Sequence, residues 1–178
     1  AGARRLRGIF GVNAEDASAR ALSLPHVPRL RLLRVHSASA SFMAELATFA
    51  PLLEHFDAWH VYGCDKLPSM RRLRTLRLIF SRPESVDLSP ADLAAITTMP
   101  SLRQLSIWEY PLDRWIDGIR QLASTNQQSL ITTLSVRTVD PHKNSTEHSP
   151  DPEVTEVLPR AVFPALRHVD AAYLLHDW

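Results

Sequence analysis

The sequence has little cysteine, little glycine and no long apolar run. Its single cysteine, Cys64, has no partner for an internal disulfide and no second thiol for a structural zinc site. We therefore expect Cys64 to be a small buried apolar side chain and the chain to be intracellular, either cytoplasmic or nuclear. No apolar stretch reaches the length of about 18 residues that a membrane-spanning helix needs, so we expect no membrane partner.

Motifs that carry common enzyme chemistry are also missing. The chain has only 5 glycines, and it contains no glycine-rich phosphate loop, no GxSxG turn and no HExxH helix. We expect no enzyme activity and no cofactor. The basic and acidic residues nearly balance, at 20 against 19. This balance gives no bulk attraction to polyanions, so the composition does not favour a nucleic-acid partner. The cluster Arg4, Arg5 and Arg7 is an alternative nucleic-acid or phosphate contact, but three arginines are too few to favour it.

What the sequence does have is one phrase that recurs along its length: an apolar residue, two residues, an apolar residue, one residue, and a third apolar residue. The phrase begins at Leu30, Leu53, Leu73, Leu102, Ile131 and Leu166, and a weaker candidate surrounds Leu6 and Ile9. From Leu30 the phrase restarts after 23, 20, 29, 29 and 35 residues, which is near the step of roughly 20 to 29 residues in leucine-rich repeats. Residues 1–178 therefore predict one irregular domain of about seven repeats.

The spacing within the phrase predicts a short strand whose second and third apolar residues face the core, because alternate side chains of a strand point to opposite faces. Between strands the apolar period becomes helical, as in 40–49 and 112–123, and Ser89-Pro90-Ala91-Asp92 and Pro152-Glu153 have the residues that begin helices. The predicted fold class is α/β, a leucine-rich-repeat solenoid with parallel strands on the concave face and helices or irregular turns on the convex face. The polar segment 140–151 is expected to be a loop insertion.

This register aligns the solvent-facing residues of successive strands in lateral rows. One row contains Arg34, Asp57, Arg77, Ser106, Ser135 and Asp170, the row two residues later contains His36, Trp59, Ile79, Trp108 and Arg137, and the row two residues earlier contains His55 and His168. Exposed tryptophan beside arginine is typical of interaction hot spots. We expect a protein or peptide to contact Arg34, His36, His55, Asp57, Trp59, Arg77, Ile79, Trp108 and Arg137 on the concave face. The alternative interpretation is that one or both tryptophans are core residues.

The proline-led phrases VPRLRLLRV, MPSLRQLSI and FPALRHVDA resemble the degenerate repeats of fungal F-box proteins that carry leucine-rich repeats, and the resemblance covers about residues 24 to 175. In that family the repeats select a substrate, while an F-box docks the ubiquitin-ligase scaffold. The resemblance implies substrate recognition for a ubiquitin ligase. No F-box helices can be recognised in this sequence. The asparagine that follows many leucine-rich-repeat strands is also absent, which leaves the repeat subclass open.

Two other classes of function remain. The chain opens without methionine and ends at Leu174-Leu175-His176-Asp177-Trp178 without an evident polar cap, which favours a piece of a longer protein or a subunit that associates end to end through residues such as Leu174 and Leu175. The pairs His55 with Asp57 and His168 with Asp170 each lie two residues apart on one strand face. Either pair could orient a general base or bind a metal, although no third ligand or nucleophile is evident.

Overall fold

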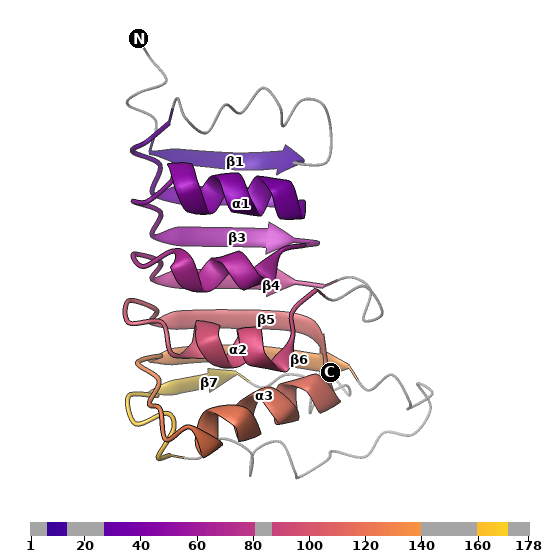
Figure 1. Cartoon of the computed structure of the whole chain (residues 1–178), viewed down its shortest axis with the longest axis vertical. Helices are drawn as coiled ribbons and strands as arrows, with labels where there is room; N and C mark the ends of the chain where they lie inside the picture. The colour runs from indigo at the N-terminus through magenta and orange to yellow at the C-terminus, as the bar shows by residue number, and fades with distance from the viewer. Residues whose placement is uncertain (1–6, 14–26, 81–86, 140–159, 171–178) are drawn as a thin grey trace.

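A computed structural model of the chain describes residues 7–13, 27–80, 87–139 and 160–170. Seven parallel strands form one sheet, and their order in the sheet follows their order in the chain (Figure 1). The strands are β1 (Gly8–Asn13), β2 (Leu32–Ser37), β3 (His55–Trp59), β4 (Thr75–Ile79), β5 (Gln104–Pro111), β6 (Thr133–Val139) and β7 (His168–Asp170). The fold is therefore mixed α/β, as predicted.

The predicted alignment of the strands is confirmed. Arg34 pairs with Asp57, Asp57 with Arg77, and the same row continues through Ser106 and Ser135 to Asp170. The core positions of the phrase are also confirmed from β2 to β6, where the second and third apolar residues are buried: Leu33, Val35, Phe56, Ala58, Leu76, Leu78, Leu105, Ile107, Leu134 and Val136. The alternation within each phrase determines which face of the strand is apolar, so one register satisfies all these strands.

The last phrase departs from this prediction. Val169 was expected to face the core, but its side chain is 49% exposed, and all three residues of β7 are exposed. Strand β7 is the last strand of the sheet in the described part of the chain, and it pairs only with β6 there. Ala171, the third apolar residue of this phrase, lies outside the described residues.

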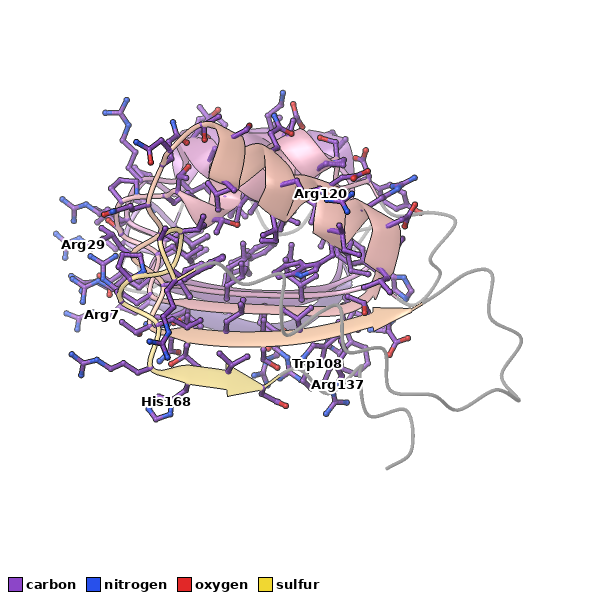
Figure 2. The ribbon with its side chains drawn as sticks, turned by 90° about the horizontal axis from the view of Figure 1, so that it is seen from below. Arg7, Arg29, Trp108, Arg120, Arg137 and His168 are labelled. Carbon is purple, nitrogen blue, oxygen red and sulfur yellow. The ribbon has the colours of Figure 1, made fainter. Side chains whose placement is uncertain are left out.

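Helices cover one face of the sheet (Figures 1 and 2). They are α1 (Ala40–Phe49), the 3-10 helix η4 (Cys64–Ser69), α2 (Pro90–Thr97) and α3 (Leu112–Ser124). The start of α2 was predicted from Ser89, whose hydroxyl accepts the backbone N–H of Asp92 while the Asp92 carboxylate accepts the backbone N–H of Ser89. This reciprocal pair satisfies two donors that the first helical turn leaves without partners.

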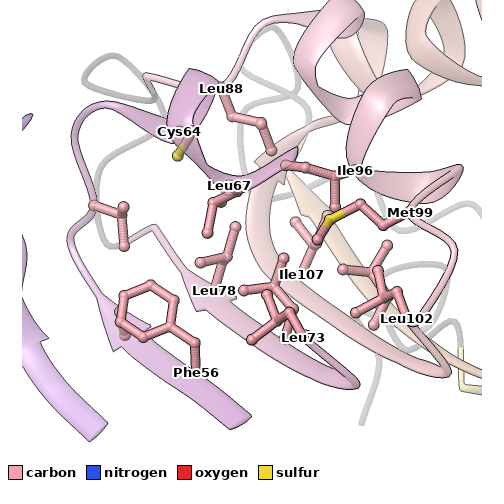
Figure 3. Packing of buried hydrophobic residues seen from close by; sticks show 14 of the residues in the cluster. Phe56, Cys64, Leu67, Leu73, Leu78, Leu88, Ile96, Met99, Leu102 and Ile107 are labelled. Carbon is pink, nitrogen blue, oxygen red and sulfur yellow. The ribbon is translucent and has the colours of Figure 1, made fainter. Parts of the chain in front are cut away.

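The core lies between the sheet and this helical layer (Figure 3). The first apolar residue of each phrase from Leu30 to Ile131 is buried there, and Cys64 is fully buried, as predicted. Tyr110 is also buried, and its hydroxyl donates a 3.0 Å hydrogen bond to the carbonyl of Leu88. Burial removes the phenol from water, so this bond supplies the partner that its polar end needs.

Several sequence predictions fall on other segments. The polar insertion 140–151, the helix start at Pro152-Glu153, and the arginines and leucines near the two ends (Arg4, Arg5, Leu174 and Leu175) lie outside the described residues. Of the weak first phrase, Ile9 lies in β1 and packs against the core, whereas Leu6 lies outside the described residues. Within the described segments, no helix is long and apolar enough to cross a bilayer.

Candidate functional site

The face of the sheet opposite the helices carries the residues that the sequence grouped as a site. In Figure 2, Trp108, Arg137 and His168 lie on the side of the sheet away from α3 and its Arg120. We call this surface the open face. Its side chains come from every second position of each strand, because the side chains at the positions between them point into the core. Strand pairing places Trp59 beside Ile79 and Ile79 beside Trp108, so the predicted apolar strip is continuous across three strands, and Arg137 flanks it on the fourth.

The two tryptophans of the strip have different surroundings. Trp59 is 44% exposed and is one of the most exposed large apolar residues in the described segments. Its ring centroid lies 5.4 Å from that of His36, which in turn lies 5.6 Å from the ring of His60. Trp59 is therefore an exposed aromatic surface, and the core interpretation is wrong for this residue.

Trp108 is half-buried because charged side chains cover it. The guanidinium carbons of Arg77 and Arg137 each lie 4.2 Å from the centroid of its ring. Its indole N–H donates to the hydroxyl of Ser135 at 3.2 Å, and that hydroxyl lies 3.2 Å from a carboxylate oxygen of Asp170. These contacts hold the indole in place, so Trp108 is a fixed cationic and aromatic platform and not a free apolar group. The roles of Ser135 and Asp170 were not predicted from the sequence, although both residues lie in the first lateral row.

The charged row differs from expectation in one respect. Asp57 lies between Arg34 and Arg77 in the sheet, as predicted, and its Oδ2 forms an ion pair with Nε of Arg34 at 2.7 Å. Arg77 stacks on Trp108 and forms no ion pair with Asp57. As a result, Oδ1 of Asp57 and Nε of Arg77 are buried atoms that have no hydrogen-bond partner among the described residues.

These side chains surround a hollow of about 220 Å³ in the open face. It is lined by Arg34, Val35, His36, Asp57, Trp59 and Arg77. The lining combines two guanidinium groups, one carboxylate, an imidazole and an exposed indole. A single side chain of a partner, with both a flat or apolar part and a polar end, would match that chemistry.

The pairs His55 with Asp57 and His168 with Asp170 were candidates for catalysis or metal binding. Within the described part of the chain, no group of three or more histidine, cysteine or acidic residues is arranged to hold a metal ion. Asp57 pairs with Arg34, and Asp170 accepts a hydrogen bond from Ser135. Among the described residues, neither carboxylate forms a hydrogen bond with the histidine two residues before it, His55 or His168.

The sequence was also compared with known protein-family models and with curated proteins. Neither comparison gives a match, and the geometry of the open face is therefore what points to a function.

Proposed function

We propose that the chain is a leucine-rich-repeat solenoid that binds a protein or peptide across the open face of its sheet. The observation that carries this proposal is the exposed indole of Trp59 at the rim of the hollow lined by Arg34, His36, Asp57 and Arg77. Tryptophan and arginine contribute a large share of the energy at protein interfaces because they bury much area for little lost entropy. The one-strand-per-repeat order and the recurring phrase support the solenoid.

The arrangement favours a partner segment that runs across the strands. Successive strands are about 4.8 Å apart, so an extended segment meets a new strand with nearly every residue or two. One apolar or aromatic side chain of that segment would pack on Trp59, and its polar end would enter the hollow. Acidic groups of the same segment would then meet Arg34 or Arg137, whose side chains are exposed on this face.

The resemblance to fungal F-box proteins makes the proposal more specific. In that form, the open face selects the substrate of a ubiquitin ligase. The recurring proline-led phrases support this form.

Selection of peptides from a random display library tests the binding proposal. The wild-type chain should enrich a common motif, and Trp59→Ala should reduce binding of the selected peptides by at least tenfold, because loss of a central aromatic anchor typically costs about 2 kcal/mol or more. Phe49→Ala is the matched control, since Phe49 is a similarly exposed aromatic residue, at 40%, but lies in α1 on the other layer. Equal losses in both variants, or a wild-type chain that enriches nothing, would contradict the proposal.

A second candidate function is assembly through the end of the sheet. The exposed strand β7, with Val169 at 49% exposure, favours it, because an exposed strand edge with an apolar side chain is a template for pairing with another chain. Light scattering over a concentration series is the test. Association that Val169→Lys abolishes would support assembly, and a chain that stays monomeric at every concentration would refute it.

A further inference from the structure

The residues that immediately precede the strands form a continuous row at one edge of the sheet. Each of them after the first donates its backbone N–H to the carbonyl of the equivalent residue before the preceding strand, at 2.8 to 2.9 Å. In order, the seven positions are Arg7, Arg31, Glu54, Arg74, Arg103, Thr132 and Arg167. Five of the seven are arginine, so the fold places these side chains in line at intervals of one or two strands.

Three more arginines lie in the turns that lead to this row: Arg29, Arg71 and Arg72. Arg7 and Arg29 are seen together at this edge in Figure 2. All of these side chains are exposed except Arg103, which is half-buried and donates to the carbonyls of Pro100 and Leu102 at 2.9 and 2.8 Å. We call the eight residues Arg7, Arg29, Arg31, Arg71, Arg72, Arg74, Arg103 and Arg167 the arginine edge.

Little negative charge offsets the arginine edge. Glu54 is the one acid in the row, and it pairs with Arg31 at 2.9 Å. The other ion pairs of the described residues belong to Arg34, Lys66 and Arg120, so the remaining arginines of the edge form none there. Eight guanidinium groups against one carboxylate give this edge a local charge of about +7, although the whole chain has a net charge of only +1.

We propose that the arginine edge binds the phosphate backbone of a nucleic acid without reading its sequence. Phosphate contacts require closely spaced cations and no base-reading side chains, which is what the edge supplies. Seven strands at about 4.8 Å extend over roughly 29 Å, a length that covers several consecutive phosphates. The fork of each guanidinium also matches two phosphate oxygens at once.

The composition of the edge favours nucleic acid over an acidic protein. The centre of a protein interface is depleted of charge and contains apolar anchors, whereas nucleic-acid interfaces are polar and strongly positive. Among the described row positions and the turn residues before them, Leu130 is the one large apolar residue that is exposed, at 43%. The surface is also separate from the hollow beside Trp59, so the binding of nucleic acid here is independent of the peptide-binding proposal.

Fluorescence anisotropy with a labelled 20-base-pair DNA duplex and a labelled 20-nucleotide single strand tests the proposal. The wild-type chain should bind at least one of them at about 50 mM salt, and affinity should fall steeply toward 200 mM. Arg72→Glu/Arg74→Glu should weaken binding at least tenfold and reduce the slope of log affinity against log salt by about 2. The control is Lys66→Glu/Arg120→Glu, which changes the net charge equally on the helical layer and should change affinity less than twofold. The two probes decide whether duplex or single strand supplies the phosphates.

Three results would overturn the inference. They are no binding of the wild-type chain to either probe at low salt, equal losses in the edge and control variants, or displacement of the nucleic acid by polyglutamate at equal charge concentration. The last result would assign the edge to an acidic protein. Thermal melting accompanies each variant, and Arg72→Gln/Arg74→Gln replaces the glutamate variant if that variant does not fold.

Discussion

The guanidinium of Arg77 lies over the indole of Trp108, 4.2 Å from its centroid, and not beside the carboxylate of Asp57 on the neighbouring strand. The guanidinium carbon of Arg137 lies at the same distance from the centroid of this ring. Guanidinium groups are weakly hydrated, and they stack on aromatic faces at little desolvation cost. Arg34 already pairs with Asp57, which leaves Arg77 available for the indole.

This stacking predicts a coupling between Arg77 and Trp108. Arg77→Ala should lower the free energy of unfolding by about 0.5 to 1 kcal/mol, because the cation–π contact lies at a partly exposed site. In a Trp108→Leu background the same substitution should have little effect. Urea unfolding of the four proteins of this double-mutant cycle gives the coupling energy. A coupling energy of zero would show that the stacked geometry does not stabilise the fold.

The capping box of α2 predicts a second effect on stability. Ser89→Ala removes the acceptor for the N–H of Asp92 and should cost about 1 kcal/mol in urea unfolding. Ser39→Ala at α1 is the comparison, since Ser39 accepts from Phe42 at 3.2 Å but has no acid in the first turn to reciprocate. The Ser89 variant should lose more stability than the Ser39 variant, and the reverse order would contradict the reciprocal cap.

The strands and their alignment could be predicted from the sequence. In each phrase the second and third apolar residues lie two positions apart, as side chains on one face of a strand do, and the first apolar residue precedes them at a fixed spacing. That pattern is local, and it leaves one register in which the buried residues of neighbouring strands face the same side. The helices 40–49 and 112–123 and the helix start at Ser89 were predictable for the same reason, because the apolar period and the capping residues that signal them extend over only a few helical turns of sequence. The 3-10 helix Cys64–Ser69 was not predicted, since CDKLPS contains no helical period.

The site was less predictable because it depends on contacts between strands. Whether Trp59 is exposed and Trp108 covered depends on which neighbours stack on each ring, and neighbours such as Arg137 are far away in the chain. The arginine edge was missed although its signal is in the sequence, where an arginine follows the first apolar residue in Leu6-Arg7, Leu30-Arg31, Leu73-Arg74, Leu102-Arg103 and Leu166-Arg167. Net charge is a sum over the whole chain, so it conceals charge that the fold gathers at one edge.

Packing between α2 and α3 predicts a third effect. A Cβ atom at Gly118 would lie 2.7 Å from Cδ2 of Leu93 and 3.2 Å from the carbonyl oxygen of Pro90. Gly118→Ala gains about 1 kcal/mol of helix propensity, but overpacking costs about 1 to 3 kcal/mol, so we expect a net loss of stability in urea unfolding. Adding Leu93→Val, which shortens the obstructing side chain, should recover part of that loss. A stabilised Gly118→Ala variant would mean that the two helices separate easily.

Two buried acidic groups predict how stability changes with pH. Burial, with smaller contributions from Asp87, Asp92 and Asp65, raises the pKa of the Cys64 thiol above its ordinary value of 9.0. Burial is also the largest cause that raises the pKa of Tyr110 above 10.0, and Arg114 opposes it. Above these ordinary values the unfolded chain releases both protons while the folded chain keeps them, so the stability present below pH 9 is lost as pH rises.

For each group, the free energy of unfolding should fall by up to about 1.4 kcal/mol per pH unit once the group is ionised in the unfolded chain. Urea unfolding at a series of pH values from about 8 to 10.5 measures this slope. A Cys64→Ala/Tyr110→Phe variant has lower stability at neutral pH, because it loses the hydrogen bond to the Leu88 carbonyl, but its stability should vary less over this alkaline range. If the slope is unchanged in the variant, other groups cause the alkaline loss and neither buried proton controls it.

The thiol of Cys64 should also react with a thiol reagent only as fast as the chain unfolds, since the reagent attacks the thiolate that burial disfavours.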